Sequence, residues 1–583
     1  MRRLLISISA ILIAVVVMGG GIQSPAPAEM VLVNGKILTV DANDSVAEAV
    51  AISAGKIVAV GTNAQIRARV GAQTRVIDLH GRTATPGLID GHVHFQATDT
   101  LYNLDLTDLA IKRMDDILER VRRQVAILKP GEWVRGRGWD EGKLVEKRAI
   151  LASDLDKVAP NNPVWLMQAS GHYGVANTAA LRLAKITRET KAPEAGTIDR
   201  DGQGNATGIM RESAASLITT LIPPLTKDQQ RTGLLKIIED FNKEGMTGAK
   251  DPGIGPEKWD LYREVLNDNK LTVRVFALWS GGTTLDSARQ ALARIETLPK
   301  PPQSLGDGRL ISGGVKLYMD GAVLARTAWS YQEWLKAPNE KDTGNFGYPT
   351  IEPEMYKQMI GLLHNAGVHV STHAIGDRAI DWVVDTYDSA LKSNPTRGLR
   401  HGIIHASFPT DRALDTMARL QKDYDAGYPE ASASFMWWLG DNYPRAVSLE
   451  NNFRMKPFGA FLKKDVKWTG GSDYTVTPYP ARYGLWTSVA RKTLTDAMPF
   501  GVEQSVDVRA ALRSYTIWAA RQNFLEDRVG SIEPGKDADI AVWDRDLYTA
   551  KTDDLKDMKC ELTLFQGKIV YKSPNTPITG EGQ

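Results

Sequence analysis

The feature that most constrains the fold is a regular alternation of short apolar runs with helical stretches from about residue 240 onward. Residues 354–366 and 378–391 have the 3.6-residue apolar period of an amphipathic helix. A strand candidate at 85–95 precedes seven others, at 246–250, 273–278, 314–319, 368–373, 402–405, 424–434 and 466–473. Strands and helices that alternate in this way predict an α/β fold, a (β/α)8 TIM barrel.

Titratable side chains lie at the ends of these runs. Four of them close an apolar run: His94, His373, His405 and Asp473. Functional groups of a barrel lie at the carboxyl ends of its strands, so we expect these four near one another, whereas Lys316 lies inside its run. In an extended strand His92 and His94 point to one side, with Asp90 on the same parity. The spacing fits two ligands of one metal ion, although two hydrogen-bonded core histidines would show it as well.

Lys316 could supply negative charge that a centre with two metal ions needs. Two divalent ions need more negative charge than four neutral imidazoles supply, and Asp473 offers one carboxylate. Lys316 could offer another only if burial removes its proton and the neutral amine reacts with carbon dioxide to form a carbamate. The alternative for Lys316 is an ordinary salt bridge, for example to Asp320.

The two ends of the chain contain further strands. We expect two strands around an Asn-Gly turn at 31–40, a hairpin from 49–53 and 56–60, an alternating strand at 538–543, and a hairpin at 562–571. Neither end alone holds enough strands for a stable sheet. We therefore predict one composite β-sandwich from residues 29–82 and 530–583, with the barrel, residues 83–529, inserted between them.

A long insertion, about residues 96–235, separates the first and second barrel strands and far exceeds an ordinary βα connection. Such an insertion would shape the pocket for a small-molecule substrate, and the alternative is a contact in a homodimer. Its His172 could stabilise an oxyanion or fix the substrate, or it could cap the next helix.

The first 28 residues have the features of a secretory signal peptide. Arg2 and Arg3 precede an apolar run that is too short to span a bilayer, and Ala-Pro-Ala at 26–28 resembles a cleavage site. We expect an exported chain, periplasmic or secreted, with no stable membrane association after cleavage; the alternative is an uncleaved anchor. The single cysteine, Cys560, excludes an internal disulfide, and the net charge of +2 gives no reason to expect nucleic acid as a partner.

Several motifs together resemble the amidohydrolase superfamily. They are Thr-Pro-Gly-Leu-Ile-Asp-Gly-His-Val-His at 85–94, Thr-His-Ala-Ile-Gly-Asp-Arg-Ala at 372–379, Gly-Gly-Ser-Asp-Tyr at 470–474, and Gly-Ser-Ile-Glu-Pro-Gly-Lys-Asp-Ala-Asp-Ile at 530–540. Gly-Trp-Asp at 138–140, Ser-Gly-His at 170–172, Val-Lys-Leu-Tyr-Met-Asp-Gly at 315–321 and Ile-Gly-Asp-Arg-Ala at 375–379 resemble amidohydrolase family 3, the branch with N-substituted formamide deformylase-like proteins.

The resemblance implies a metal-dependent hydrolase on a TIM barrel with a composite β-sandwich. It implies two divalent ions, zinc by expectation, with this set of ligands: His92, His94 and Asp473 for the more buried ion, carboxylated Lys316 as the bridge, and His373 and His405 for the second. Two segments depart from the family: Ile404 replaces the usual glutamate before His405, and 431–438 lacks the usual Gln-Pro.

The expected reaction is hydrolysis of the C–N bond of an amide, such as an N-formyl or N-acyl amine. The metal ions would activate water, with Asp473 as general base and then general acid, and His172 beside the oxyanion. The alternatives are hydrolysis of a lactone, a carbamate, a cyclic amide or a phosphoester, or an exported binding or regulatory protein with a decayed site. The chain contains no Gly-x-Ser-x-Gly nucleophile elbow, which disfavours a serine hydrolase.

Overall fold

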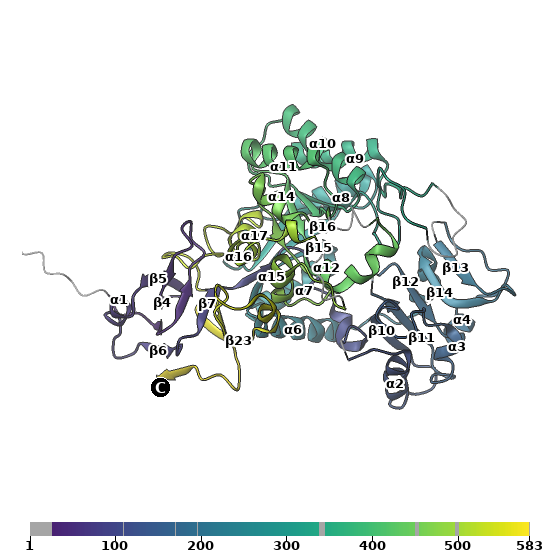
Figure 1. The fold of residues 1–583 in the computed structure, drawn as a ribbon, viewed down its shortest axis with the longest axis horizontal. Helices are drawn as coiled ribbons and strands as arrows, with labels where there is room; N and C mark the ends of the chain where they lie inside the picture. The colour runs from purple at the N-terminus through teal and green to yellow at the C-terminus, as the bar shows by residue number, and fades with distance from the viewer. Residues whose placement is uncertain are drawn as a thin grey trace, which may run out of the picture.

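The computed structural model describes residues 26–108, 110–169, 171–194, 196–336, 344–448, 454–495 and 501–581. Its centre is an eight-stranded parallel sheet in sequence order: β8 (Leu88–Asp90), β15 (Met246–Ile254), β16 (Arg274–Ser280), β17 (Leu310–Tyr318), β18 (Val370–Ala374), β19 (Gly402–His405), β20 (Tyr428–Ala431) and β21 (Thr469–Gly470). The amide of Gly91, just past β8, donates to the carbonyl of Gly470 at 2.8 Å, so the first and last strands meet. The sheet is thus a nearly closed barrel (Figure 1), and the TIM-barrel prediction is confirmed.

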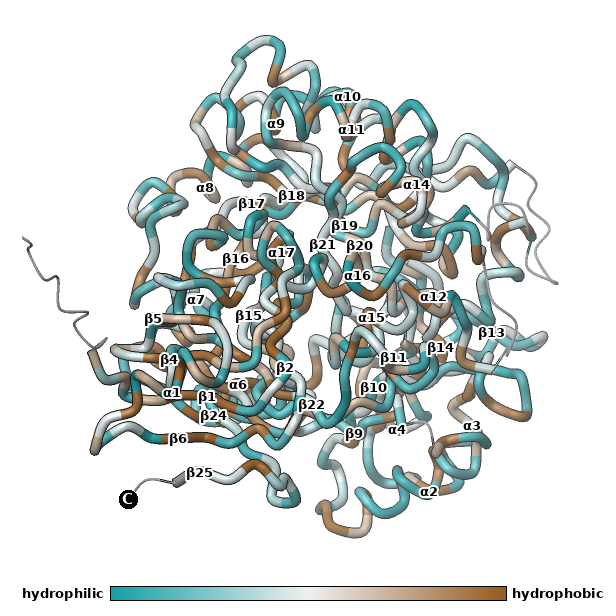
Figure 2. The backbone as a smooth tube through the Cα atoms, turned by 60° about the vertical axis from the view of Figure 1, so that its left-hand side comes forward, coloured by the Kyte–Doolittle hydropathy of each residue, from teal (hydrophilic) through white to brown (hydrophobic). Residues whose placement is uncertain are grey.

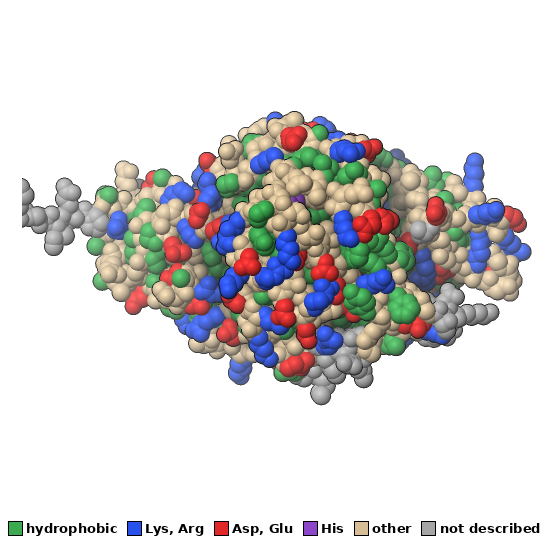
Figure 3. Space-filling model, turned by 90° about the horizontal axis from the view of Figure 1, so that it is seen from above, with side chains coloured by type: hydrophobic (Ala, Val, Ile, Leu, Met, Phe, Trp, Pro, Cys, Tyr) green, Lys and Arg blue, Asp and Glu red, His purple; other side chains and the backbone are tan. Residues whose placement is uncertain are grey.

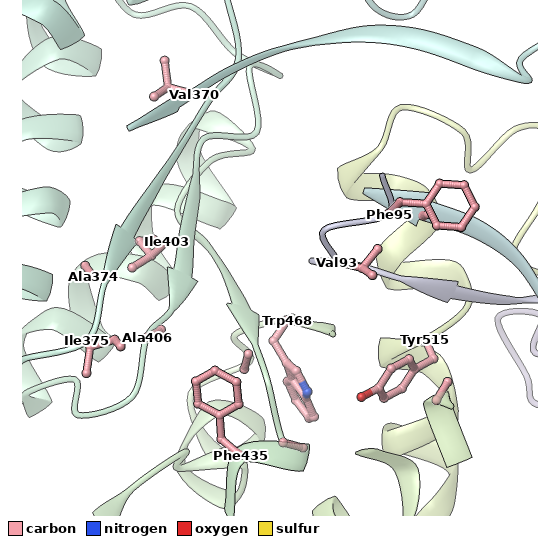
Figure 4. Close-up of a cluster of buried hydrophobic side chains, with 14 of the residues drawn as sticks. Val93, Phe95, Val370, Ala374, Ile375, Ile403, Ala406, Phe435, Trp468 and Tyr515 are labelled. Carbon is pink, nitrogen blue, oxygen red and sulfur yellow. The ribbon is translucent and has the colours of Figure 1, made fainter. Parts of the chain in front are cut away.

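Helices cover the outside of this barrel. The main ones are α6 (Lys227–Lys243), α7 (Pro256–Asn267), α8 (Leu285–Glu296), α9 (Pro353–Asn365), α10 (Asp377–Ser393) and α11 (Asp411–Tyr424). The two predicted helices match α9 and α10 within three residues. Hydrophilic and hydrophobic segments alternate along α9, α10 and α11 (Figure 2), as amphipathic helices require. Their apolar faces lie on a continuous core that includes Val370, Ile403 and Trp468 (Figure 4).

Some predicted strand boundaries were wrong. The 424–434 run begins with the last residue of α11, and its final residue opens α12 (Ser434–Leu439), so only four residues form β20. Only Thr469 and Gly470 of the 466–473 run are strand, and both histidines of the 85–95 run lie beyond the end of β8 at Asp90. Loop residues such as Val466 and Trp468 are fully buried. Apolar sequence therefore continues past the hydrogen-bonded part of the strand, so the length of an apolar run overestimates the length of the strand.

Strands from both ends of the chain form two further sheets. One has the order β25 (Thr579–Glu581), β6 (Arg75–Asp78), β1 (Met30–Val33), β4 (Ala49–Ser53) and β5 (Lys56–Gly61); the other has β24 (Lys568–Lys572), β23 (Cys560–Phe565), β22 (Ile540–Trp543), β7 (Thr83–Pro86), β2 (Lys36–Leu38) and β3 (Val46–Ala47). One buried cluster contains Leu32 from the first sheet and Ile540 from the second. The hairpins β4–β5 and β23–β24 are confirmed. The pair around Asn34 is not a hairpin, because β1 pairs with β4 and β6 while β2 pairs with β3 and β7.

Between β8 and β15 the chain forms a separate mixed sheet beside the barrel (Figure 1). Its order is β13 (Gly196–Arg200), β14 (Ala206–Glu212), β12 (Tyr173–Ala176), β11 (Val164–Gln168), β10 (Val134–Trp139) and β9 (Leu104–Asp105). It contacts the barrel where Nδ2 of Asn442 donates to both carboxylate oxygens of Asp140, at 3.0 and 3.1 Å. The sheet therefore stands at the carboxyl-terminal side of the barrel strands.

Most of the predicted leader lies outside the described residues, which begin at Ala26. Among the residues that the structure describes, no helix combines the length and apolar character needed to cross a membrane.

Candidate metal centre

Two histidines and an aspartate converge where the first and last barrel strands end. Nε2 of His92 lies 3.3 Å, and Nε2 of His94 lies 3.2 Å, from Oδ1 of Asp473. The backbone joins the same two loops, because the amide of Asp473 donates to the carbonyl of His92 at 2.7 Å. One donor atom from each of the three residues lies within 4.8 Å of the others. This spacing allows the three side chains to share one metal ion.

His373 and His405 approach this group from β18 and β19. Their ring centres lie 4.6 Å apart, and the ring of His405 lies 5.2 Å from that of His92. Nε2 of His373 donates to the carbonyl of Gly321 at 3.0 Å, which leaves the lone pair of Nδ1 available. Nε2 of His405 lies 3.9 Å from Oδ2 of Asp473. These two imidazoles can therefore serve an ion beside the first.

Lys316 enters the centre from β17. Its side chain is buried, and Nζ makes no hydrogen bond or ion pair with any residue that the structure describes; it lies 4.5 Å from the centre of the Tyr318 ring. Burial lowers the pKa of Lys316 to about 7, against the opposing charge of Asp473. The alternative of a salt bridge to Asp320 is wrong. A neutral, buried and unpaired amine is what carbamate formation requires.

Burial sets the protonation states of the other groups. It lowers the pKa of His92 and His373 to about 3 and that of His405 well below its usual value. Burial works to raise the pKa of Asp473, but the neighbouring imidazoles hold it well below the ordinary range. The imidazoles of His92, His373 and His405 are therefore neutral and the carboxylate ionised at neutral pH, and these are the forms that bind metal.

The donor atoms also pass a test of fit. Oδ1 of Asp473 and Nδ1 of His405 are buried and have no hydrogen-bond partner among the described residues, although two imidazole nitrogens lie close to that Oδ1. Buried polar atoms are rarely left without a partner. Donors that gather around one point without bonding to one another match the ligand set of a cation.

Two aspartates that do not face this point hold the loops around it. Asp90 accepts hydrogen bonds from the amide of His92 at 3.0 Å and from the hydroxyl of Ser472 at 2.6 Å, and so ties the first and last strand ends together. Asp320 accepts three amide hydrogen bonds, at 2.8 to 3.0 Å, from Trp329, Ile375 and Gly376. Sequence reasoning assigned neither role. The adjacent glycine of each Asp-Gly pair was the only local signal.

His172 lies at the start of β12 in the insertion, with Nδ1 3.1 and 3.2 Å from the two carboxylate oxygens of Glu212. The helix-capping alternative is wrong, because Asn177 caps α4 (Thr178–Leu183). Glu212 was missed from the sequence, since only the pairing of β12 with β14 brings it to His172.

Ile404 stands where the family usually has a glutamate, and other residues hold the adjacent His405 here. Ile404 is buried on β19, and the following His405 has a left-handed backbone, φ 70°. Nζ of the buried Lys456 donates to the carbonyl of His405 at 2.8 Å. The ring of Phe435 stacks on the imidazole, with ring centres 5.2 Å apart. Lys456 and Phe435 thus fix the conformation of His405, and neither was anticipated.

Comparison with known proteins agrees with this arrangement. Residues 75–571 match the model of the amidohydrolase family. The chain is 29% identical to N-substituted formamide deformylase from Arthrobacter pascens, over 93% of this chain and 98% of that protein. The chain therefore belongs to the amidohydrolase family and is a metal-dependent hydrolase.

Solved structures show the same fold. A metal-dependent hydrolase of unassigned activity from Pyrococcus horikoshii OT3 superposes with a TM-score of 0.68 at 24% identity, over 90% of this chain and 99% of that one. Atrazine chlorohydrolase from Arthrobacter aurescens TC1, solved with zinc, superposes with a TM-score of 0.52 at 16% identity, over 93% of this chain and 95% of that one. The likeness of fold thus extends over about 90% of this chain.

Proposed function

We propose that this protein hydrolyses a C–N bond in an N-formyl or N-acyl amide, with two zinc ions as its cofactor. The observation that carries the proposal is the convergence of six donor side chains where the barrel strands end: His92, His94, Lys316, His373, His405 and Asp473. The deformylase relative acts on a formamide, and the solved chlorohydrolase contains zinc, which supports this bond class and this metal.

The ligands divide between two ions. His92, His94 and Asp473 would hold the first, His373 and His405 would hold the second, and Lys316, as a carbamate, would supply negative charge to both. When bound, the ions lower the pKa of a coordinated water and polarise the scissile carbonyl. Asp473 takes the proton of the attacking water at its carboxylate and then delivers it to the leaving amine.

His172 acts beside this centre. Glu212 accepts from Nδ1 of His172 and so orients the imidazole ring. The imidazole of His172 stabilises negative charge on the carbonyl oxygen or fixes the amide in place. We further propose export by way of residues 1–28, and a division into a β-sandwich from 29–82 and 530–583 and a barrel from 83–529 with its insertion at about 96–235. On the face of the molecule shown in Figure 3, acidic and basic side chains are interspersed, which agrees with an enzyme that acts on a small molecule.

The proposal is tested by removing the metal. Chelated protein should lose more than about 99% of its hydrolysis of N-benzylformamide and N-acetyl amines, and two equivalents of zinc added with bicarbonate should restore it. A panel with a lactone and a phosphotriester, measured on the same zinc-loaded protein, fixes the bond class. The proposed hydrolysis would be disproved if the purified protein contained well under one metal ion per chain and the metal-loaded protein hydrolysed none of the amides.

The His172 pair makes a separate prediction. We expect His172→Ala to lower kcat by about 10²-fold, and Glu212→Gln to lower it about 10-fold, because an amide still holds the ring but stabilises its charged form less. Zinc content and the midpoint of thermal unfolding should stay unchanged in both variants. If His172→Ala kept the wild-type kcat, His172 would have only a structural role. Glu189→Gln, an exposed carboxylate in the same insertion, is the control.

A further inference from the structure

A cavity of about 380 Å³ lies between the insertion and the barrel, beside the metal centre. Its walls come from the segment after β8, from α6, from β10, and from the loop after β21. That loop begins at Asp473, and the carbonyl of its Tyr474 accepts the amide hydrogen of His94 at 2.8 Å. The cavity therefore borders on the loops that carry the ligands of the first ion. A substrate whose scissile bond lies at the metals would extend its remaining part into this space.

The guanidinium of Arg137, from β10, forms part of the cavity wall. Its side chain makes no hydrogen bond or ion pair with any residue that the structure describes. Burial lowers the pKa of Arg137, and the charges of Asp99, Tyr474 and Asp473 act on it in the opposite direction. Arginine stays charged in proteins. Arg137 is partly buried, and a partly buried cation without a partner gains from an anionic ligand.

The acidic groups around the cavity already have other partners. Oδ1 of Asp105 accepts from the amide and the hydroxyl of Thr107, at 2.9 and 2.6 Å. Asp240 is paired with Lys236. Asp99, whose charge also acts on Arg137, accepts from the side-chain amide of Asn103 at 2.8 Å. None of them contacts the guanidinium, so its donors remain available to a ligand.

The rest of the cavity favours an apolar group. Its wall includes Leu101, Ile237, Pro478, Tyr479 and Tyr483. The ring of Tyr479 lies against those of Phe241 and Tyr474 at 5.1 and 5.2 Å, which makes a fixed aromatic surface. A ligand that fits both features has one anionic group for the guanidinium and an apolar or aromatic body for this surface.

We propose that Arg137 binds the carboxylate of the substrate, and that the substrate is an N-acyl or N-formyl amino acid with an apolar or aromatic side chain. The inference rests on the proposed amide hydrolysis. A carboxylate is favoured over a phosphate because one guanidinium offers a planar pair of donors that matches two coplanar oxygens, and because Asp105 and Asp240 nearby would repel a doubly charged group.

The test compares N-formylphenylalanine, as both enantiomers, with N-formyl-2-phenylethylamine, which lacks only the carboxylate. On zinc-loaded protein we expect kcat/KM at least about 10²-fold higher for one enantiomer of the acid than for the amine derivative. Arg137→Met should lower kcat/KM for the acid by about 10²-fold and change it less than about 3-fold for the neutral substrate, and Arg137→Lys should lie between. Arg135→Met, on the same strand but outside the cavity wall, should behave like the wild type.

A binding measurement separates this inference from the proposed function. Calorimetry on metal-free protein compares 3-phenylpropionate with 3-phenylpropanamide, so that no carboxylate can bind through zinc. We expect the acid to bind at least about 10-fold more tightly, and Arg137→Met to abolish the difference. Arg137-dependent binding of the acid in a protein that hydrolyses no amide would leave the carboxylate site in place and disprove the reaction.

The opposite result is equally informative. Hydrolysis of both formamides at equal kcat/KM, with equal binding of acid and amide, would leave the reaction in place and overturn the role of Arg137. Should Arg137→Met fail to fold, the comparison of acid with amide on the wild-type protein still decides, because equal binding there is incompatible with a carboxylate site.

Discussion

Replacement of Lys316 by alanine should lower kcat/KM for amide hydrolysis by at least about 10³-fold, with loss of one or both zinc ions. The reason is charge: four neutral imidazoles and Asp473 supply too little for two divalent ions, and Lys316 is the side chain placed to supply more. Short-chain carboxylates such as propionate should restore part of the activity, because they fit the space that the side chain leaves and replace the bridging anion. Zinc per chain by mass spectrometry and kcat/KM with and without propionate measure both effects.

Lys250 provides a matched control. It is also fully buried in the barrel, but its Nζ is paired with Glu430 at 2.7 Å and hydrogen-bonded to Ser371 at 2.9 Å. Lys250→Met should cost about 3–5 kcal/mol of unfolding free energy, since it leaves Glu430 buried without its partner. Propionate should not restore what this variant loses. Full activity in Lys316→Ala, or equal rescue of both variants, would contradict a bridging carbamate.

The same lysine predicts a pH dependence of metal loading. Since burial lowers the pKa of Lys316 to about 7, its amine is mostly neutral above that pH and mostly protonated below it. Only the neutral amine reacts with carbon dioxide. Metal-free protein supplied with zinc at one fixed concentration of dissolved carbon dioxide should therefore gain activity faster at pH 8 than at pH 6, by up to about 10-fold.

Much of the fold and of the donor set could be predicted because both leave local patterns. A strand has a period of 2 and a helix one of 3.6, so their alternation identifies the barrel. Barrel topology then brings strand ends together, and His373 and His405 could be placed from their position in the sequence alone. The boundaries were less predictable, since buried loops such as the one containing Trp468 are as apolar as strands.

What could not be predicted depends on pairing between distant segments. Glu212 reaches His172 only because β14 lies beside β12, and Arg137 lines a cavity only because the insertion lies against the barrel. Asn34-Gly35 has the sequence of a hairpin turn, yet burial of β1 and β2 in different sheets outweighs the local preference. These contacts and strand pairings are decided by tertiary packing. A single sequence has no periodic pattern from which such packing can be predicted.

Asp473→Asn should lower kcat by about 10²- to 10⁴-fold, because the amide keeps the size of the side chain but cannot accept the proton of the attacking water. The neighbouring imidazoles hold the pKa of Asp473 well below its ordinary value, so the wild-type carboxylate stays ionised across mildly acidic pH. Protonation of this carboxylate therefore contributes to the acid limb of the wild-type pH profile only in the strongly acidic range. That contribution should be absent in Asp473→Asn, because the amide does not titrate.

Loss of a ligand and loss of a base must be distinguished in this variant. Zinc content measured beside kcat does so: a chain that retains most of its zinc and still loses more than about 10²-fold in kcat has lost the proton acceptor. Asp320→Asn is the control, a second buried aspartate just after a strand, whose amide oxygen can still accept two of the three backbone hydrogen bonds. It should change kcat less than about 10-fold, since it takes no part in the proton transfer. A wild-type rate in zinc-loaded Asp473→Asn would assign the proton transfer to another group.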